Sequence, residues 1–235
     1  PMLTLAAAEA CGGRPSDAMP LACVVECVHT YSLIHDDLPA MDNDDFRRGR
    51  LTSHKVYGEG IAVLVGDALL TQAFEIAAQA KGWPRYPHTA LIREITETAG
   101  SLKLIAGQVA DLEGEGENLS IAQLRYIHEH KTSALLACSV RLGGMSANCT
   151  ARQLKALTDF GYHLGLAFQV IDDILDVTQT TEQLGKTAGK DESVNKSTYP
   201  AILGLDESKA EAARLTARAL AALKQFGPNA AHLEQ

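Results

Sequence analysis

The sequence predicts an all-α fold, a bundle of long helices whose interior is the natural place for a binding site. Three observations favour this class. Alanine is the commonest residue, only 5% of the chain is aromatic, and β-branched residues cluster only in short runs. Apolar residues recur at the spacing of one helix face in several segments. The strict alternation typical of a strand is not sustained anywhere, so composition and periodicity agree.

Three stretches show the helical period most clearly, and they begin at about Leu21, Leu124 and Phe160. The expected core-facing positions are Leu21, Val24, Val28 and Ser32 in the first, Leu124, Ile127, Leu135 and Cys138 in the second, and Phe160, Leu164, Phe168, Ile171 and Leu175 in the third. Glycine, proline and polar residues predict breaks at 12–20, 49–60, 81–87, 113–118 and 180–196.

Length, charge and cysteine usage exclude several classes of protein. A chain of 235 residues can bury one substantial core, which means one domain or at most two. The formal charge is −8, whereas a protein that coats nucleic acid needs an excess of basic residues, so that class is excluded. No membrane span is expected, because the longest apolar run, near Ile61, is interrupted by Asp67. The five cysteines form no Cys-x-x-Cys pair, which favours reduced core thiols in the cytoplasm.

Charge is concentrated in residues 36–50, where five aspartates and three arginines occur in the run DDLPAMDNDDFRRGR. Asp36 and Asp37 follow the first periodic stretch, so they lie near a helix C-terminus, where acids oppose the helix dipole unless a cation is present. Pro39 permits a bend that could return Asp42 to the side of Asp36. Clustered carboxylate oxygens are ligands that Mg²⁺ accepts, usually together with water and substrate phosphate.

Two arginines, Arg47 and Arg48, follow this acidic cluster. Guanidinium groups suit bidentate contacts with phosphate. Cation-binding acids next to anion-binding arginines therefore suggest a diphosphate held through a metal ion. The alternative at this point is a solvated loop with exposed ion pairs.

A second acidic cluster occurs in the run FQVIDDILD, with Asp172, Asp173 and Asp176. In a helix the outer two lie about 40° apart on one face, and Gln169 shares that face. Three acids in an otherwise apolar helix would repel one another without a cation. Two aspartate clusters on separate helices of one bundle argue against a purely solvent-facing role for either of them.

Basic residues occur in two further places. Lys131, followed by Thr132, interrupts an apolar stripe, where a cation must reach water or meet an anion. Lys186, Lys190 and Lys196 lie in a segment rich in glycine and serine that could move as a lid.

Taken together, the motifs resemble those of the trans-isoprenyl diphosphate synthases, most closely the bacterial farnesyl diphosphate synthases. The resemblance extends from Pro1 to about Leu205. The motifs that carry it occur in the expected order: DDxxxxD with RR (Asp36 to Arg48), GQxxDL (Gly107 to Leu112), KT (Lys131, Thr132), FQxxDDxxD (Phe168 to Asp176), GKxxGKD (ending at Asp191) and KSTYP (Lys196 to Pro200). It implies an isoprenoid-synthase bundle of helices around a central cavity.

The resemblance also implies roles for individual residues. Asp36, Asp42 and Asp172 would ligate three Mg²⁺ ions on an allylic diphosphate, with Asp37, Asp173 and Asp176 supporting that cluster. Arg47, Lys131 and Lys186 would hold the allylic diphosphate, Arg48 and His29 would hold isopentenyl diphosphate, and Lys196 would belong to the substrate-binding set. Lys131, Thr132 and Gln169 would stabilise the allylic cation after the diphosphate departs.

Product length is expected to depend on Tyr31, five positions before Asp36. In bacterial farnesyl synthases an aromatic residue at this position, with two extra residues in the first motif (here Pro39 and Ala40), limits the product to fifteen carbons. Helix geometry alone favours Ser32, because Tyr31 lies about 140° around the axis from Asp36.

A geranylgeranyl or longer-chain synthase is therefore the alternative enzyme, and a non-catalytic helical subunit of a heteromeric synthase is the alternative outside catalysis. The second DDxxD motif disfavours a terpene cyclase.

We expect residues 1–235 to form a single polyprenyl synthase domain. Relatives carry a basic Gly-Lys-Arg-x-Arg segment before the position of Pro1 and continue into a further helix after that of Gln235, so the chain is expected to lack both. The resemblance also implies a homodimer.

Overall fold

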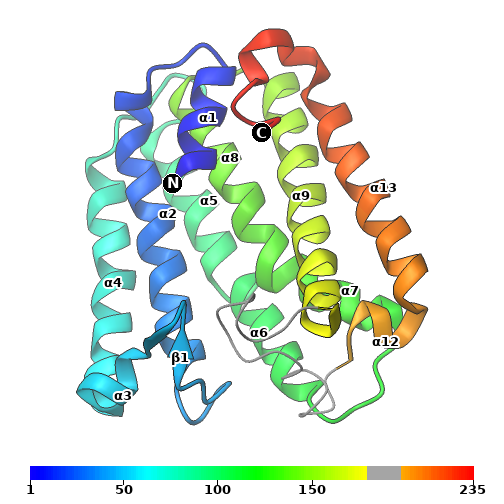
Figure 1. Cartoon of the computed structure of the whole chain (residues 1–235). Coiled ribbons are helices and arrows are strands. Elements are labelled where there is room, and N and C mark those ends of the chain that lie inside the picture. The colour runs from blue at the N-terminus through cyan, green and yellow to red at the C-terminus, as the bar shows by residue number, and fades with distance from the viewer. Residues whose placement is uncertain (179–196) are drawn as a thin grey trace.

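The computed structural model describes residues 1–178 and 197–235 and confirms the all-α prediction (Figure 1). The predicted break at 180–196 lies outside the described residues. The main helices are α1 (Met2–Ala10), α2 (Pro15–Asp36), α3 (Ser53–Tyr57), α4 (Glu59–Gln79), α5 (His88–Ala99), α6 (Leu104–Glu113), α7 (Ile121–His128), α8 (Ala134–Ser146), α9 (Ala151–Thr178), α12 (Tyr199–Leu203) and α13 (Leu205–Leu223). A π-helix, Glu129–Ser133, joins α7 to α8, and a 3₁₀ segment, Lys224–Ala230, follows α13.

The helix boundaries follow local chemistry. Proline at the first position of α2 has no amide hydrogen to leave unpaired, so the helix begins at Pro15 and the predicted break at 12–20 is shorter than expected. The capping box formed by Ser120 and Gln123 starts α7. The acidic glycine-rich stretch after Glu113 is the predicted connection between α6 and α7.

A short antiparallel hairpin, which the sequence did not predict, follows α2. Strands β1 (Phe46–Arg47) and β2 (Arg50–Leu51) pair Phe46 with Leu51 and Arg47 with Arg50. The two linking residues, Arg48 and Gly49, have φ of 53° and 74°, as both central residues of a type I′ turn require. Two-residue strands are too short for an alternating pattern to reveal them.

The core is formed by the apolar faces of the long helices. In α2 the predicted positions Leu21, Val24 and Val28 are buried, and Tyr31 joins them in the same cluster. The predicted face of α9 is partly wrong, because Phe168 is 56% exposed and Ile171 is 41% exposed. This helix packs against both α8 and α13, so its buried surface turns toward residues such as Val170, while Phe168 faces a cavity.

Two expectations are modified: that the cysteines are core thiols and that no segment could span a membrane. All five cysteines are free, but only Cys138 and Cys149 are buried and Cys23 is exposed. Within the described residues, α4 is long and apolar enough to cross a membrane by length and composition, despite Asp67. The same helix packs along α2 in the bundle (Figure 1).

Two glycines allow the π-helix to lie directly against its neighbours. A Cβ at Gly107 of α6 would lie 2.2 Å from the backbone nitrogen of Lys131, and a Cβ at Gly165 of α9 would lie 2.4 Å from the Cα of Ser133. Backbone atoms cannot yield as a flexible side chain can. The π-helix is therefore held between α6 and α9 by contacts that only glycine permits.

Replacement of Gly165 by alanine should destabilise the protein. We expect Gly165→Ala to lower the free energy of unfolding by about 1–3 kcal/mol, because the added methyl group must push α9 away from the π-helix. Urea denaturation followed by circular dichroism measures the change. Gly60→Ala in α4 is the matched control, since a Cβ there meets nothing within 4 Å. Equal stability of the two variants would contradict the tight packing.

Candidate active site

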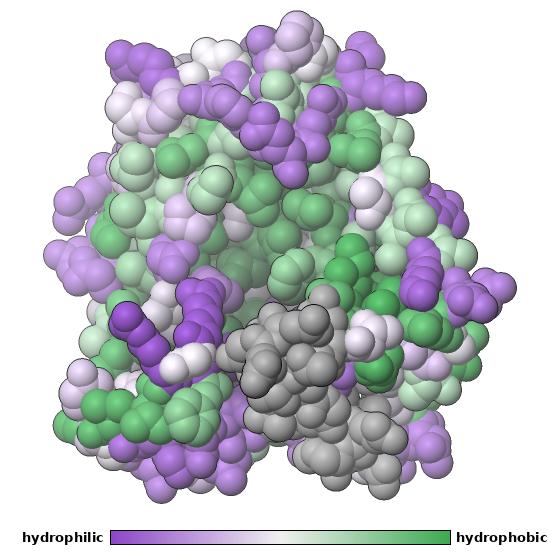
Figure 2. Space-filling model, viewed as in Figure 1, coloured by the Kyte–Doolittle hydropathy of each residue, from purple (hydrophilic) through white to green (hydrophobic). Residues whose placement is uncertain are grey.

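A cavity of about 790 Å³ lies among α2, α6, the π-helix, α8, α9 and the hairpin. It is visible as an apolar hollow bordered by hydrophilic side chains in Figure 2. Its lining is largely apolar and includes Leu104, Leu135, Leu136 and Phe168. Eight of the predicted site residues line it: His29, Tyr31, Asp36, Arg47, Arg48, Lys131, Thr132 and Asp172.

The two aspartate clusters reach this cavity from different helices. Asp36 is the last residue of α2, and Asp172 lies in α9. The loop after Asp36 turns back, because the backbone N–H of Asp42 donates to the carbonyl of Asp36 at 2.9 Å. Burial raises the pKa of Asp36, Lys131 opposes that rise, and the nearby charge of Asp42 adds to it. The chain at Asp42 thus returns to the end of α2, but Asp42 does not line the cavity, and its role as a metal ligand stays a prediction.

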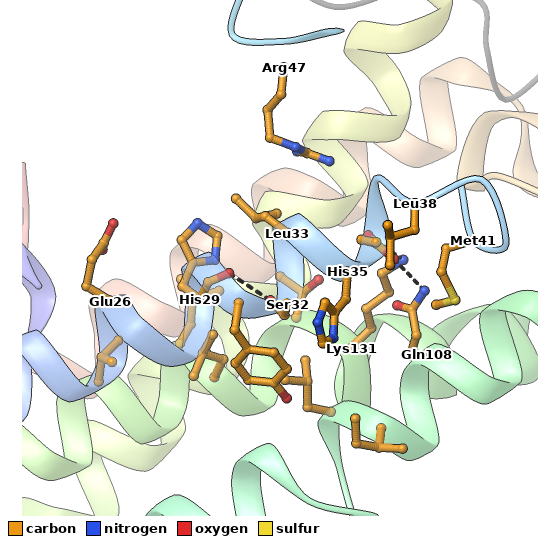
Figure 3. A pocket seen from close by; sticks show the side chains of 18 of the residues that line it. Glu26, His29, Ser32, Leu33, His35, Leu38, Met41, Arg47, Gln108 and Lys131 are labelled. Carbon is orange, nitrogen blue, oxygen red and sulfur yellow. Dashed lines mark hydrogen bonds and ion pairs between the residues drawn. The ribbon is translucent and has the colours of Figure 1, made fainter. Parts of the chain in front are cut away.

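Lys131 is held between two carboxylates at the cavity wall. Its Nζ lies 2.7 Å from Asp111 and 3.4 Å from Asp36. Gln108 completes the arrangement, because its Nε2 donates to Asp36 Oδ1 at 2.5 Å (Figure 3). Gln108 and Asp111 belong to the GQxxDL motif, and no role was predicted for either residue. The signal was available, since residues three apart share a helix face and an acid on the cavity side needs a cation.

The π-helix presents two consecutive polar residues to the cavity. Lys131 and Thr132 both belong to it, and π-helical turns occur frequently at functional sites. The Thr132 hydroxyl donates to Gln169 Oε1 at 2.5 Å, which joins the π-helix to α9 as the predicted grouping of these residues requires. Because that hydrogen is committed to Gln169, the Thr132 oxygen presents lone pairs rather than a proton to the cavity.

The structure places Asp37 away from the cavity. Its carboxylate accepts hydrogen bonds from Arg47 Nε at 2.9 Å and Nη2 at 2.5 Å, and the residue is only 3% exposed. One step along a helix turns a side chain by about 100°, so neighbours such as Asp36 and Asp37 diverge. Asp37 therefore anchors the hairpin, and its role as a metal ligand stays a prediction that this geometry does not support.

The remaining acids of the second cluster also differ from Asp172. Asp173 accepts a hydrogen bond from the backbone N–H of Tyr199 at 2.9 Å and lies 4.0 Å from His128. Asp176 is 4% exposed, and its Oδ2 has no hydrogen-bond partner within the described residues. Neither lines the cavity. In this arrangement Asp173 secures α12, and the metal-related role of Asp176 stays a prediction.

The last predicted residues lie along α2 or outside the described part of the chain. His29 lines the cavity, and burial lowers its pKa, which favours the neutral imidazole. Tyr31 is 5% exposed and lines the same cavity. Lys186 lies outside the described residues, as do Lys190 and Lys196. Their predicted contacts with substrate stay predictions.

The donor set suits a metal ion that takes further ligands from elsewhere. Within residues 1–178 and 197–235, no three acidic, histidine or cysteine side chains already form a metal-binding group. Magnesium is commonly bound by one or two carboxylates, with water and substrate phosphate supplying the rest. Asp36 and Asp172 at one cavity fit that pattern.

The chain matches the model of the polyprenyl synthetase family over residues 1–227. It is 50% identical over 228 residues to a dimethylallyltranstransferase from Fischerella ambigua, a match that covers 96% of this chain and 66% of the relative. It is 48% identical over 211 residues to the farnesyl diphosphate synthase of Geobacillus stearothermophilus (89% and 71% covered) and 50% identical over 233 residues to the chloroplastic geranylgeranyl pyrophosphate synthase of Catharanthus roseus (98% and 65% covered). The chain thus spans about two thirds of the length of these relatives.

Solved structures share the architecture. A geranyltransferase from Helicobacter pylori, crystallised with magnesium and isoprenyl diphosphate, superimposes with a TM-score of 0.87 at 38% identity, covering all of this chain and 78% of that one. The fold is that of the all-α isoprenyl synthases, and the chain belongs to the polyprenyl synthetase family.

Proposed function

We propose that the protein is a Mg²⁺-dependent prenyltransferase that condenses isopentenyl diphosphate with dimethylallyl or geranyl diphosphate to give farnesyl diphosphate. The observation that carries the proposal is that Asp36, Asp172 and Lys131 all line one largely apolar cavity. A diphosphate needs cations, and a prenyl chain needs an apolar space. The Helicobacter pylori structure, with magnesium and isoprenyl diphosphate, supports this assignment by similarity.

Different residues of the cavity would bind the metal, bind the diphosphate and stabilise the allylic cation. Asp36 and Asp172 would hold magnesium, three ions by family analogy, and bound magnesium would neutralise the charge that develops on the departing diphosphate. Lys131 and Arg47, which both line the cavity, would bind the same anion directly. The lone pairs of Thr132, oriented by Gln169, would stabilise the allylic cation.

The rest of the cavity would protect that cation until it reacts. Apolar side chains such as Leu135 and Phe168 exclude water that would otherwise capture it. The double bond of isopentenyl diphosphate, held near His29 and Arg48, then attacks the cation. Loss of a proton to the released diphosphate, the acceptor that family analogy implies, would complete a product five carbons longer than the allylic substrate.

Farnesyl diphosphate as the product rests on Tyr31, which lines the cavity five residues before Asp36 along α2. A buried ring there limits the depth open to a growing chain. The alternative is a geranylgeranyl or longer-chain synthase, because a geranylgeranyl synthase is as similar to this chain as the other relatives are.

Assembly and location are further parts of the proposal. The side chains of Ile61, Leu64 and Val65 are exposed on α4, an apolar surface that a second copy of the chain would cover in a homodimer. Five free cysteines support a cytoplasmic location.

The product assay tests the proposed function directly. Full-length protein incubated with isopentenyl diphosphate, geranyl diphosphate and Mg²⁺ should yield farnesol after dephosphorylation, and chelation of the metal should abolish the yield. Chromatography of the alcohols identifies the products. Longer alcohols would favour the alternative synthase, and no product would favour a non-catalytic subunit.

Loss of either predicted metal ligand should impair turnover. We expect Asp36→Asn and Asp172→Asn each to lower kcat by about a hundredfold or more, because several kcal/mol of charge stabilisation is lost. Steady-state kinetics measures the effect, and circular dichroism checks the fold. Asp206→Asn, exposed at the start of α13 and not among the cavity-lining residues, is the control. Full activity of both cavity variants would exclude this metal site.

A smaller residue at position 31 should lengthen the product. Tyr31→Ala removes the ring that limits the cavity, so we expect twenty-carbon alcohol in addition to farnesol. The measurement is the chain-length distribution at equal substrate conversion. An unchanged distribution would show that another residue limits growth.

A further inference from the structure

The ring of Tyr31 contacts one other ring along α2, that of His35. The two residues are four apart and so lie on the same face of the helix. Their ring centroids are 5.8 Å apart with an interplanar angle of 82°, an edge-to-face arrangement. Both residues line the cavity, so this contact lies at the wall that a growing chain would meet.

His35 is itself fixed to a second helix. Its Nε2 lies 3.0 Å from the backbone carbonyl oxygen of Val63 in α4. Because a carbonyl oxygen can only accept, Nε2 carries the proton and donates it. The imidazole therefore links the C-terminal turns of α2 to α4.

The approach of His35 to α4 depends on the absence of a side chain at Gly66. A Cβ at that position would lie 2.0 Å from Nε2 of His35 and 2.4 Å from its Cδ2. The imidazole thus occupies the space that any other residue at position 66 would fill. Figure 3 shows the His35 ring beside the cavity, near Ser32 and Lys131.

From these contacts we infer that His35 is a positioning residue for product length: because it is anchored to α4, it holds the Tyr31 ring in place at the cavity wall. The inference rests on the proposed function, because it concerns the product of that reaction. A tyrosine side chain has staggered χ1 alternatives, and a neighbour fixed at both ends excludes those that overlap it. A free ring at position 31 could rotate away as the chain grows, whereas a braced ring cannot.

Two variants remove the brace without altering Tyr31. His35→Ala deletes the imidazole, and Gly66→Ala displaces it from α4. In each variant we expect the ratio of twenty-carbon to fifteen-carbon alcohol to rise about three- to tenfold, the range expected for loss of one aromatic edge contact. The KM for geranyl diphosphate should stay within about twofold of the wild-type value, since neither residue is assigned a contact with the diphosphate.

Gly60→Ala is the matched control for Gly66→Ala. It adds the same methyl group to the same helix, where a Cβ meets nothing within 4 Å. Its product ratio should equal that of the wild type. If Gly66→Ala fails to fold, the product ratio of His35→Ala alone tests the inference.

A double-mutant cycle separates bracing from an independent effect. If His35 acts through Tyr31, adding His35→Ala to Tyr31→Ala should leave the product ratio of Tyr31→Ala unchanged. An unchanged ratio in His35→Ala, when Tyr31→Ala itself lengthens the product, would overturn the inference. So would a full additive effect in the double variant. Failure of the wild-type protein to form any prenyl product would instead overturn the proposed function.

Discussion

The site depends on Lys131, a cation enclosed by the carboxylates of Asp111 and Asp36. Two acids that approach one lysine would repel each other without it, and a lysine in an apolar wall would be costly without them. The contact joins α2, α6 and the π-helix at one point. It fixes the position of Asp36 from one side, and Gln108 fixes it from another. The arrangement of the cavity rim is thus a property of three helices together.

Much of the fold and part of the site followed from sequence patterns. The period of α2 identified Leu21, Val24 and Val28 as core residues, and the bend at Pro39 anticipated the return of Asp42. The patterns could not separate Asp36 from Asp37, because only the hairpin shows that Arg47 takes the second carboxylate. The spacing of Gln108 and Asp111 placed both on one face of α6, but that this face meets Lys131 depends on the close packing at Gly107. Phe168 was assigned to the core because an apolar residue has the same periodicity beside a cavity as inside a bundle.

Neighbouring residues in both aspartate clusters have different structural roles. Asp36 and Asp172 face the cavity, whereas Asp37 secures the hairpin and Asp173 secures α12 through the backbone of Tyr199. A paired aspartate motif therefore combines one group available to a ligand with one that holds an adjacent segment. Such a division explains why acids so close in sequence need not all bind metal.

The π-helix at Glu129–Ser133 restricts how the chain can change in length. Deletion of one residue there could restore regular α-helical winding, but it would turn everything on one side of the cut by about 100° relative to the other. Lys131 and Thr132 could then no longer face the cavity while α8 kept its packing. A substitution in this turn leaves the register of α8 unchanged, whereas an insertion or a deletion alters it.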